Sequence, residues 1–314
     1  MRLALASLLT ALALGALTAG PGEASQSLFD ASVQFISLKV NGKGEALLTY
    51  RRSDGHLRHV LVWGAVNARE PTQGVAQVRF RFDYAGGWGK YRKAGYWMRF
   101  ENRCASYDGP QLALLLAACK APDGSYWAVQ AWQRRLPNLG FDPWLRQQSY
   151  VELHVSHWSG ALPVLEAYSH WTYDGEWQGI FGRLTYLGKP VYGFGANPKG
   201  APTDGYGRNV YVDTLDSAYG QGWKREAGIL THKGTGTFCH SFVPQHPFPG
   251  YPSRQVRPAA PGARYRVTVS GPGVTPVLQV EVPGLTANDH AHDEVTRALF
   301  DRVMAGDRAC ASER

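Results

Sequence analysis

Apolar and polar residues alternate along the N-terminal half of the chain, which is the pattern of β-strands with one face in water. The clearest run is Gln77 to Tyr84, where apolar and aromatic residues occupy every second position. Strands are also predicted at 33–40, 45–51, 57–66 and 126–133, with turn sequences such as Asn41-Gly42-Lys43-Gly44 and Ser53-Asp54-Gly55 between the first three. Three strands at this spacing predict a meander in a sandwich.

The second half repeats the strand pattern and ends in the one convincing helix. Strands are predicted at 150–158, 265–270 and 277–282, and a hairpin at 165–186 around Asp174-Gly175. Asp289 can cap a helix in which Val295, Leu299 and Val303 recur at four-residue steps, so this stripe is expected to pack on a sheet. Alanine and leucine also favour a short helix over a strand at 112–118.

These elements predict an all-β fold with two sandwich-like domains and a C-terminal helix packed on the second. A proline-containing connector at 136–143 places the boundary near residue 146, giving domains at 25–146 and 147–314.

Residues 1–24 have the pattern of a secretory signal peptide. Arg2 precedes an apolar run from Leu3 to Leu17, and Gly22-Glu23-Ala24 fits a cleavage site. No later stretch approaches the 18 apolar residues that a membrane span needs, so we expect a secreted protein without a stable span. An uncleaved N-terminal anchor is the alternative.

Cysteine usage agrees with an oxidising compartment. The four cysteines are Cys104, Cys119, Cys239 and Cys310. Four cysteines allow three connectivities, of which Cys104–Cys119 and Cys239–Cys310 are favoured. A metal site would need closely spaced thiols, which the sequence lacks.

Positive charge is concentrated in the N-terminal half. Residues 28–146 hold 17 Lys or Arg against 9 Asp or Glu, whereas residues 147–314 hold 15 of each. This asymmetry favours an acidic partner for the first half, with a general solubility bias as the alternative.

The strongest binding feature is the basic and aromatic run 79–103, interrupted by a flexible turn at Ala85-Gly86-Gly87. It contains seven basic and two acidic residues, with eight aromatics between Phe80 and Phe100. Cations attract an anionic polymer, and aromatic rings stack on sugars or bases. The alternative is a solvent-exposed strand face over an aromatic core, which would give the same pattern without a ligand. The predicted ligand-binding residues here are Arg79, Arg81, Arg92 and Lys93.

Aromatic residues of the second half could form a carbohydrate-binding platform. Trp171 and Tyr173 share a strand face, Trp177 lies across the Asp174-Gly175 turn, and Trp158 is nearby in sequence. Burial of these rings in a sandwich core is the alternative.

A third candidate site lies between Thr203 and Asp216. Tyr206 and Arg208 could bind a ligand there, and Asp204 and Asp213 are weak candidates for acid–base catalysis. Surface ion pairs would explain the same residues. His290 and His292 lie at a helix start, where capping explains the neighbouring acids, so neither a metal nor a cofactor is expected.

Together these features predict an extracellular or cell-surface protein that binds an acidic or carbohydrate polymer. Nucleic acid is compatible with the pattern but less favoured in an exported chain. The alternatives are a secreted hydrolase of glycans or esters that uses paired carboxylates, and a structural surface protein without a ligand.

Overall fold

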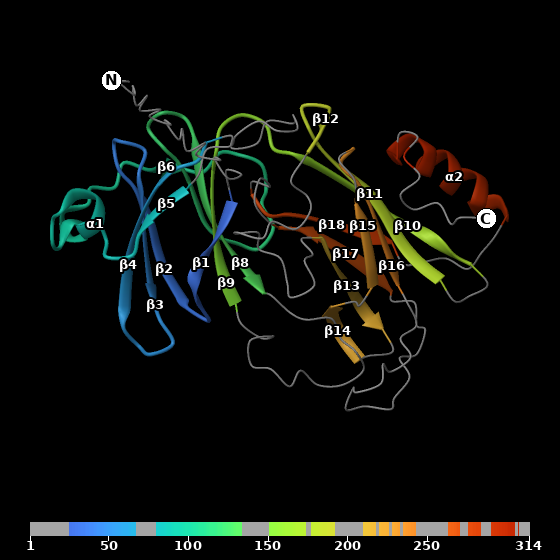
Figure 1. The fold of residues 1–314 in the computed structure, drawn as a ribbon, viewed down its shortest axis with the longest axis horizontal. Helices are drawn as coiled ribbons and strands as arrows, with labels where there is room; N and C mark the ends of the chain where they lie inside the picture. Colours follow the sequence, from blue (N-terminus) through green and yellow to red (C-terminus); the bar gives the residue numbers. More distant parts are fainter. Residues whose placement is uncertain are drawn as a thin grey trace, which may run out of the picture.

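The computed structural model describes residues 25–66, 80–133, 151–173, 177–191, 210–217, 220–225, 228–232, 235–242, 263–270, 276–283, 290–304 and 307. Antiparallel strands dominate these residues and form four sheets, accompanied by two α-helices (Figure 1). The all-β, sandwich-like fold is confirmed.

The first sheet contains the predicted meander. β2 (Gln34–Val40), β3 (Ala46–Arg51), β4 (Leu57–Gly64) and β5 (Phe80–Asp83) follow one another in chain order. The turn between β2 and β3 closes on Asn41, whose side-chain oxygen accepts hydrogen bonds from the backbone N–H groups of Lys43 and Glu45, at 2.9 and 3.1 Å. These two bonds form an Asx turn, in which the side chain of Asn41 serves as the acceptor for backbone N–H groups of the connection.

The second sheet brings together strands that are far apart in the sequence. Its order is β1 (Ser25–Ala31), β9 (Val151–Trp158), β8 (Tyr126–Gln133), β7 (Leu115–Lys120) and β6 (Ala105–Ser106). The first two sheets pack face to face, and side chains such as Val60 and Val62 of β4 meet Trp127 and Val155 in one apolar core. Alternating inward side chains from both sheets give the sandwich.

The expectation of a short helix at 112–118 is wrong. Residues from Leu115 onward form β7, which pairs with β8 on one side and β6 on the other. These pairings supply backbone hydrogen bonds from distant parts of the chain, and they outweigh the modest helix preference of alanine and leucine. Leu115 and Leu116 are left exposed, at 40% and 44% of their surface.

Two further sheets contain the remaining strands, all of which follow β9 in the chain. One contains β10 (Val164–Tyr173), β11 (Trp177–Tyr186), β16 (Thr237–Phe242) and β15 (Gly228–His232), with the short β12 (Lys189–Pro190) at β11. The other contains β14 (Gly220–Arg225), β13 (Val210–Ser217), β17 (Arg264–Val269) and β18 (Leu278–Pro283). They share a core that includes Ile180, Val212, Phe238 and Val267.

The C-terminal helix α2 (His290–Met304) packs on β10 and β11, as predicted. Val303 and Met304 are buried against Phe181, and Leu299 is half-buried there. Val295 does not continue this contact, because 69% of its surface is exposed. The apolar stripe therefore covers the sheet only through the C-terminal part of the helix.

Hydrogen bonds and an aromatic contact connect the two halves. The Gln130 side chain donates to the carbonyl of Val277 and accepts from its N–H, both at 2.9 Å, and the rings of Trp132 and Tyr211 lie 4.8 Å apart between centroids. β9 follows residue 146 yet pairs with β1 and β8 of the second sheet. The division into domains at this residue stays a prediction.

Candidate functional site: a basic projection from the first sheet

Residues 84–103, which we call the basic projection, leave the first sheet after β5 and return to β6. They contain one turn of α-helix, α1 (Trp88–Tyr91), and a 3-10 helix, η1 (Tyr96–Arg99). Figure 1 shows this segment at the end of the molecule opposite α2. The projection holds five Lys or Arg and one acidic residue, a net charge of +4.

A buried carboxylate anchors the base of the projection. Glu45 lies immediately before β3 and is only 4% exposed. It accepts hydrogen bonds from Lys90 Nζ, Tyr91 OH and, at 2.9 Å, Asn41 Nδ2. Burial alone would raise the pKa of Glu45, but these three donors outweigh it and hold the pKa below its usual value. Glu45 is therefore an ionised anchor, and Lys90 also lies 4.2 Å from the centre of the Trp63 ring.

Asp83 is a second anchor of the same helix. Its carboxylate accepts the backbone N–H of Ala85 at 2.9 Å and that of Lys90 at 3.1 Å. The alternation in residues 77–84 predicts that Asp83 lies on the solvent-exposed face of its strand, yet its side chain is buried, at 7% exposure. The N–H of Lys90 lies in the first turn of α1, where backbone donors have no partner within the helix. Asp83 supplies the acceptor that this donor needs, and its side chain is buried as a result.

The turn at 85–87 is held in place by aromatic packing. Gly87 has a φ of 106°, and a Cβ there would lie 2.5 Å from the Tyr96 ring. Tyr96 stacks on Tyr91 with centroids 4.6 Å apart, and Trp97 stacks on His59 of β4 at 3.9 Å. The glycine thus permits a close contact that fixes the two helices together.

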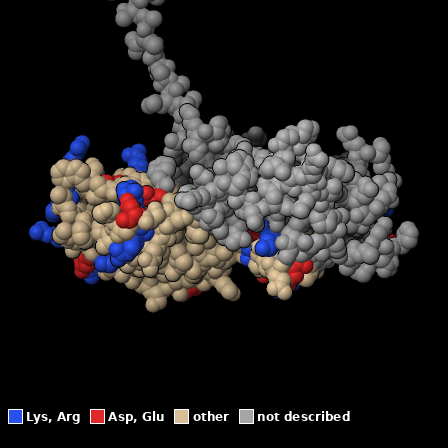
Figure 2. All heavy atoms as spheres, turned by 90° about the horizontal axis from the view of Figure 1, so that it is seen from below, with Lys and Arg blue, Asp and Glu red and all other residues tan. Residues whose placement is uncertain are grey.

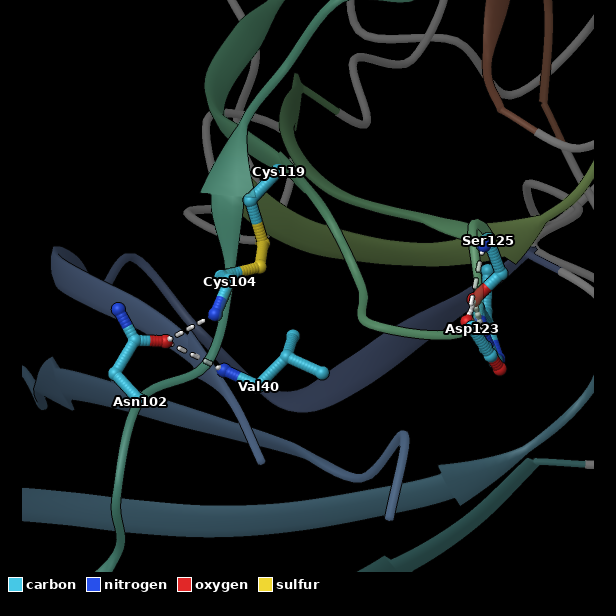
Figure 3. The surroundings of a disulfide bond; sticks show 7 residues. Val40, Asn102, Cys104, Cys119, Asp123 and Ser125 are labelled. Atoms are coloured by element: carbon cyan, nitrogen blue, oxygen red, sulfur yellow. Dashed lines mark hydrogen bonds between the residues drawn. A yellow bond between two sulfur atoms is a disulfide. The ribbon is translucent and has the colours of Figure 1, made fainter. Parts of the chain in front are cut away.

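The C-terminal end of the projection is fixed at three points. Asn102 Oδ1 accepts the N–H groups of Val40 and Cys104, at 3.0 and 3.2 Å (Figure 3). The N–H of Arg103 donates to the carbonyl of Val40 at 2.6 Å. The predicted disulfide Cys104–Cys119 is confirmed and ties this end to β7. Cys310 lies outside the described residues, so the pairing Cys239–Cys310 stays a prediction.

The outer surface of the projection is basic. Arg92, Lys93 and Arg99 are exposed, as is Arg81 of β5. Among the residues that the structure describes, none of these four cations has a carboxylate within ion-pair distance, whereas Arg103 pairs with Glu101 at 2.7 Å. Figure 2 shows Lys and Arg side chains at the end of the molecule that carries the N-terminal sheets.

Two large apolar side chains of the projection are also exposed. Trp88 exposes 50% of its surface and Met98 exposes 70%. In the sequence, Trp88 is one of eight aromatics in the basic and aromatic run with nothing to separate it from the others, and no signal points to Met98. Their exposure becomes visible only once Tyr91, Tyr96 and Trp97 are packed on the sheet.

The other predicted binding residues lie elsewhere. Tyr173 of β10 pairs through its backbone with Trp177 of β11, which confirms the hairpin, but the side chains of Trp171, Tyr173 and Trp177 lie outside the described set. Arg79, Asp204, Tyr206 and Arg208 also lie outside it. Trp158 is 2% exposed, so its ring offers no face to a ligand.

Asp213 is buried in an arginine cluster. Its carboxylate lies 2.6 Å from Arg225 Nε and 2.9 Å from Arg266 Nη2. Burial would raise the pKa of Asp213, but the two guanidinium groups lower it below its usual value. A carboxylate held ionised in this way favours a structural role over proton transfer at neutral pH.

Comparison with known proteins finds no matching family model, curated protein or solved structure. Across the described ranges, no group of three or more His, Cys, Asp or Glu side chains is arranged to hold a metal ion. No helix in that part of the chain is both long and apolar enough to cross a membrane.

Proposed function

We propose that the protein is exported and binds an anionic polymer outside the cell through the basic projection and Arg81 of β5. The observation that carries this proposal is the set of four exposed cations without an acidic partner among the described residues: Arg81, Arg92, Lys93 and Arg99. Unpaired cations keep their full field for a ligand, whereas paired ones are largely neutralised.

The fixed backbone of the projection supports binding over a merely solvated loop. Glu45, Asp83 and the disulfide hold it at three points, so little conformational freedom remains to be lost when a ligand binds. The Cys104–Cys119 disulfide is also compatible with an oxidising compartment and agrees with the signal-like residues 1–24.

Retention on insoluble polymers tests the proposal. The mature, oxidised protein is applied to an immobilised polyanion, to cellulose and to chitin, together with the variants Arg92→Ser/Lys93→Ser and Lys189→Ser/Arg297→Ser. The second variant removes the same charge from exposed positions in β12 and α2. Retention on the polyanion that is lost only in Arg92→Ser/Lys93→Ser supports the proposal. Equal loss in both variants, or none, contradicts it.

Two other functions expected from the sequence are weaker. A hydrolase that uses Asp213 conflicts with the arginines that occupy its carboxylate. For the aromatic hairpin β10–β11, the structure gives the backbone register. The aromatic side chains that a neutral-glycan site would need lie outside the described residues. Retention on cellulose or chitin that resists salt would favour the hairpin over the basic projection.

A further inference from the structure

Trp88 differs from the other aromatic residues of the basic projection. Residues 84–103 contain six aromatic side chains. Five of them have a ring partner: Tyr84 stacks on Phe82, Tyr91 on Tyr96, Trp97 on His59, and Phe100 meets Tyr96 edge to face. Trp88 has no ring or cation partner among the described residues, and half of its surface is exposed.

The position of Trp88 is set by the two anchors of the projection. The residues that follow it, Lys90 and Tyr91, carry the donors that bind Glu45 and Asp83. Gly87, which precedes it, is fixed under the Tyr96 ring. The indole is therefore presented from a rigid backbone, which lowers the entropy cost of contact with a ligand.

We propose that the polymer is an acidic polysaccharide and that Trp88 stacks on one of its sugar rings while exposed cations of the same segment bind its carboxylates. This inference rests on the function proposed above. A polyuronate carries both groups that such a surface needs, an anionic oxygen pair for arginine and an apolar C–H face for an aromatic ring. A polyphosphate chain offers only the first, so Trp88 would gain nothing from it.

An anionic membrane is less favoured by the same observations. Helices that lie in a membrane surface bury a broad apolar face in the lipid. Here α1 spans four residues, and the projection exposes only two large apolar side chains, Trp88 and Met98. An apolar surface of two side chains suits contact with a single sugar ring better than insertion into a bilayer.

Binding to three probes tests the inference: polygalacturonate, polyphosphate of matched charge, and phosphatidylglycerol vesicles. The variants are Trp88→Ala, Trp88→Tyr, which keeps a ring, and Leu187→Ala, which changes an exposed apolar residue (69% against 50% for Trp88) in another turn. Circular dichroism confirms that each variant is folded. We expect Trp88→Ala to weaken polygalacturonate binding at least about fivefold without changing its salt dependence, while Trp88→Tyr and Leu187→Ala stay near the wild type.

The contrary outcomes separate the two proposals. Polygalacturonate binding that is unchanged in Trp88→Ala, or polyphosphate binding that is as tight as that of polygalacturonate, overturns the polysaccharide assignment and leaves charge-driven polymer binding intact. Preferential vesicle binding that depends on Trp88 also overturns it, in favour of lipid. Absence of binding to all three probes at low salt contradicts the proposed function itself.

Discussion

The phenol of Tyr91 donates a hydrogen bond to the buried carboxylate of Glu45, which lies 46 residues earlier in the chain. This bond joins the one-turn helix of the basic projection to the first sheet, and Lys90 reinforces it on the same oxygen. The sequence predicts a flexible turn in a basic and aromatic run, and this long-range contact fixes that segment on the sheet.

Replacing Glu45 with Gln should destabilise the protein by about 1–3 kcal/mol, because the half-buried Lys90 would lose its charged, buried partner. Urea denaturation followed by tryptophan fluorescence measures the change. Glu101→Gln is the control, since Glu101 is exposed in its pair with Arg103 and its loss should cost no more than about 0.5 kcal/mol. Equal effects of the two substitutions would contradict the role given to Glu45.

Gly87→Ala should also be costly, by about 2 kcal/mol or more, since the new Cβ meets the Tyr96 ring and the backbone has a positive φ. Gly42→Ala provides a matched control in another turn, where no atom lies within 4 Å of the added Cβ. Thermal unfolding of both variants gives the comparison. A Gly87→Ala protein as stable as Gly42→Ala would show that the turn is free to move.

Acid should destabilise the fold through His157. Its Nδ1–H donates to the Gly64 carbonyl at 2.9 Å, its Nε2 lies 2.8 Å from Ser125 Oγ, and its ring stacks on Trp127. Burial lowers the pKa of His157, and the opposing effects of the Gly64 carbonyl and the Asp123 carboxylate do not cancel it.

The sign of this effect follows from proton uptake. An unfolded chain with the ordinary histidine pKa of 6.5 binds the proton more readily than the folded protein. Stability attributed to His157 is therefore complete above about pH 6.5 and declines as the pH falls below that value. Urea midpoints between about pH 5 and 8 should show a shallower decline in His157→Gln but not in His56→Gln, which changes an exposed turn residue. An unaltered decline in His157→Gln would exclude this histidine as the cause.

Loss of the Cys104–Cys119 disulfide should lower stability by about 3 kcal/mol, the value expected for a loop of this length. Because the bond fixes the end of the basic projection, Cys104→Ser/Cys119→Ser should also bind polyanions more weakly at a temperature where it remains folded. Denaturation and binding of the variant are compared with those of the wild type. Full affinity in the folded variant would show that Asn102 and Val40 hold this end without help.

Local patterns predicted most of the strands and could not predict the anchors of the site. The meander, the β10–β11 hairpin and the Cys104–Cys119 bond follow from alternation, turn residues and cysteine spacing within short windows. Burial of Asp83 and Glu45 depends on donors in α1, and the strand at 115–120 depends on pairing with β8. These contacts are tertiary, so no local window contains the information.

Salt dependence of binding to a soluble polyuronate tests the central claim most directly. The affinity is measured across a series of salt concentrations for the wild type, for Arg81→Ser/Arg92→Ser/Lys93→Ser/Arg99→Ser, and for Lys189→Ser/Arg297→Ser. Binding of a polyanion releases counterions in proportion to the cations engaged, so the logarithm of affinity falls with the logarithm of salt concentration. We predict a steep fall for the wild type and the Lys189→Ser/Arg297→Ser control, and weak binding with a nearly flat dependence for the fourfold variant. A fourfold variant with the slope and affinity of the wild type would contradict binding through the basic projection.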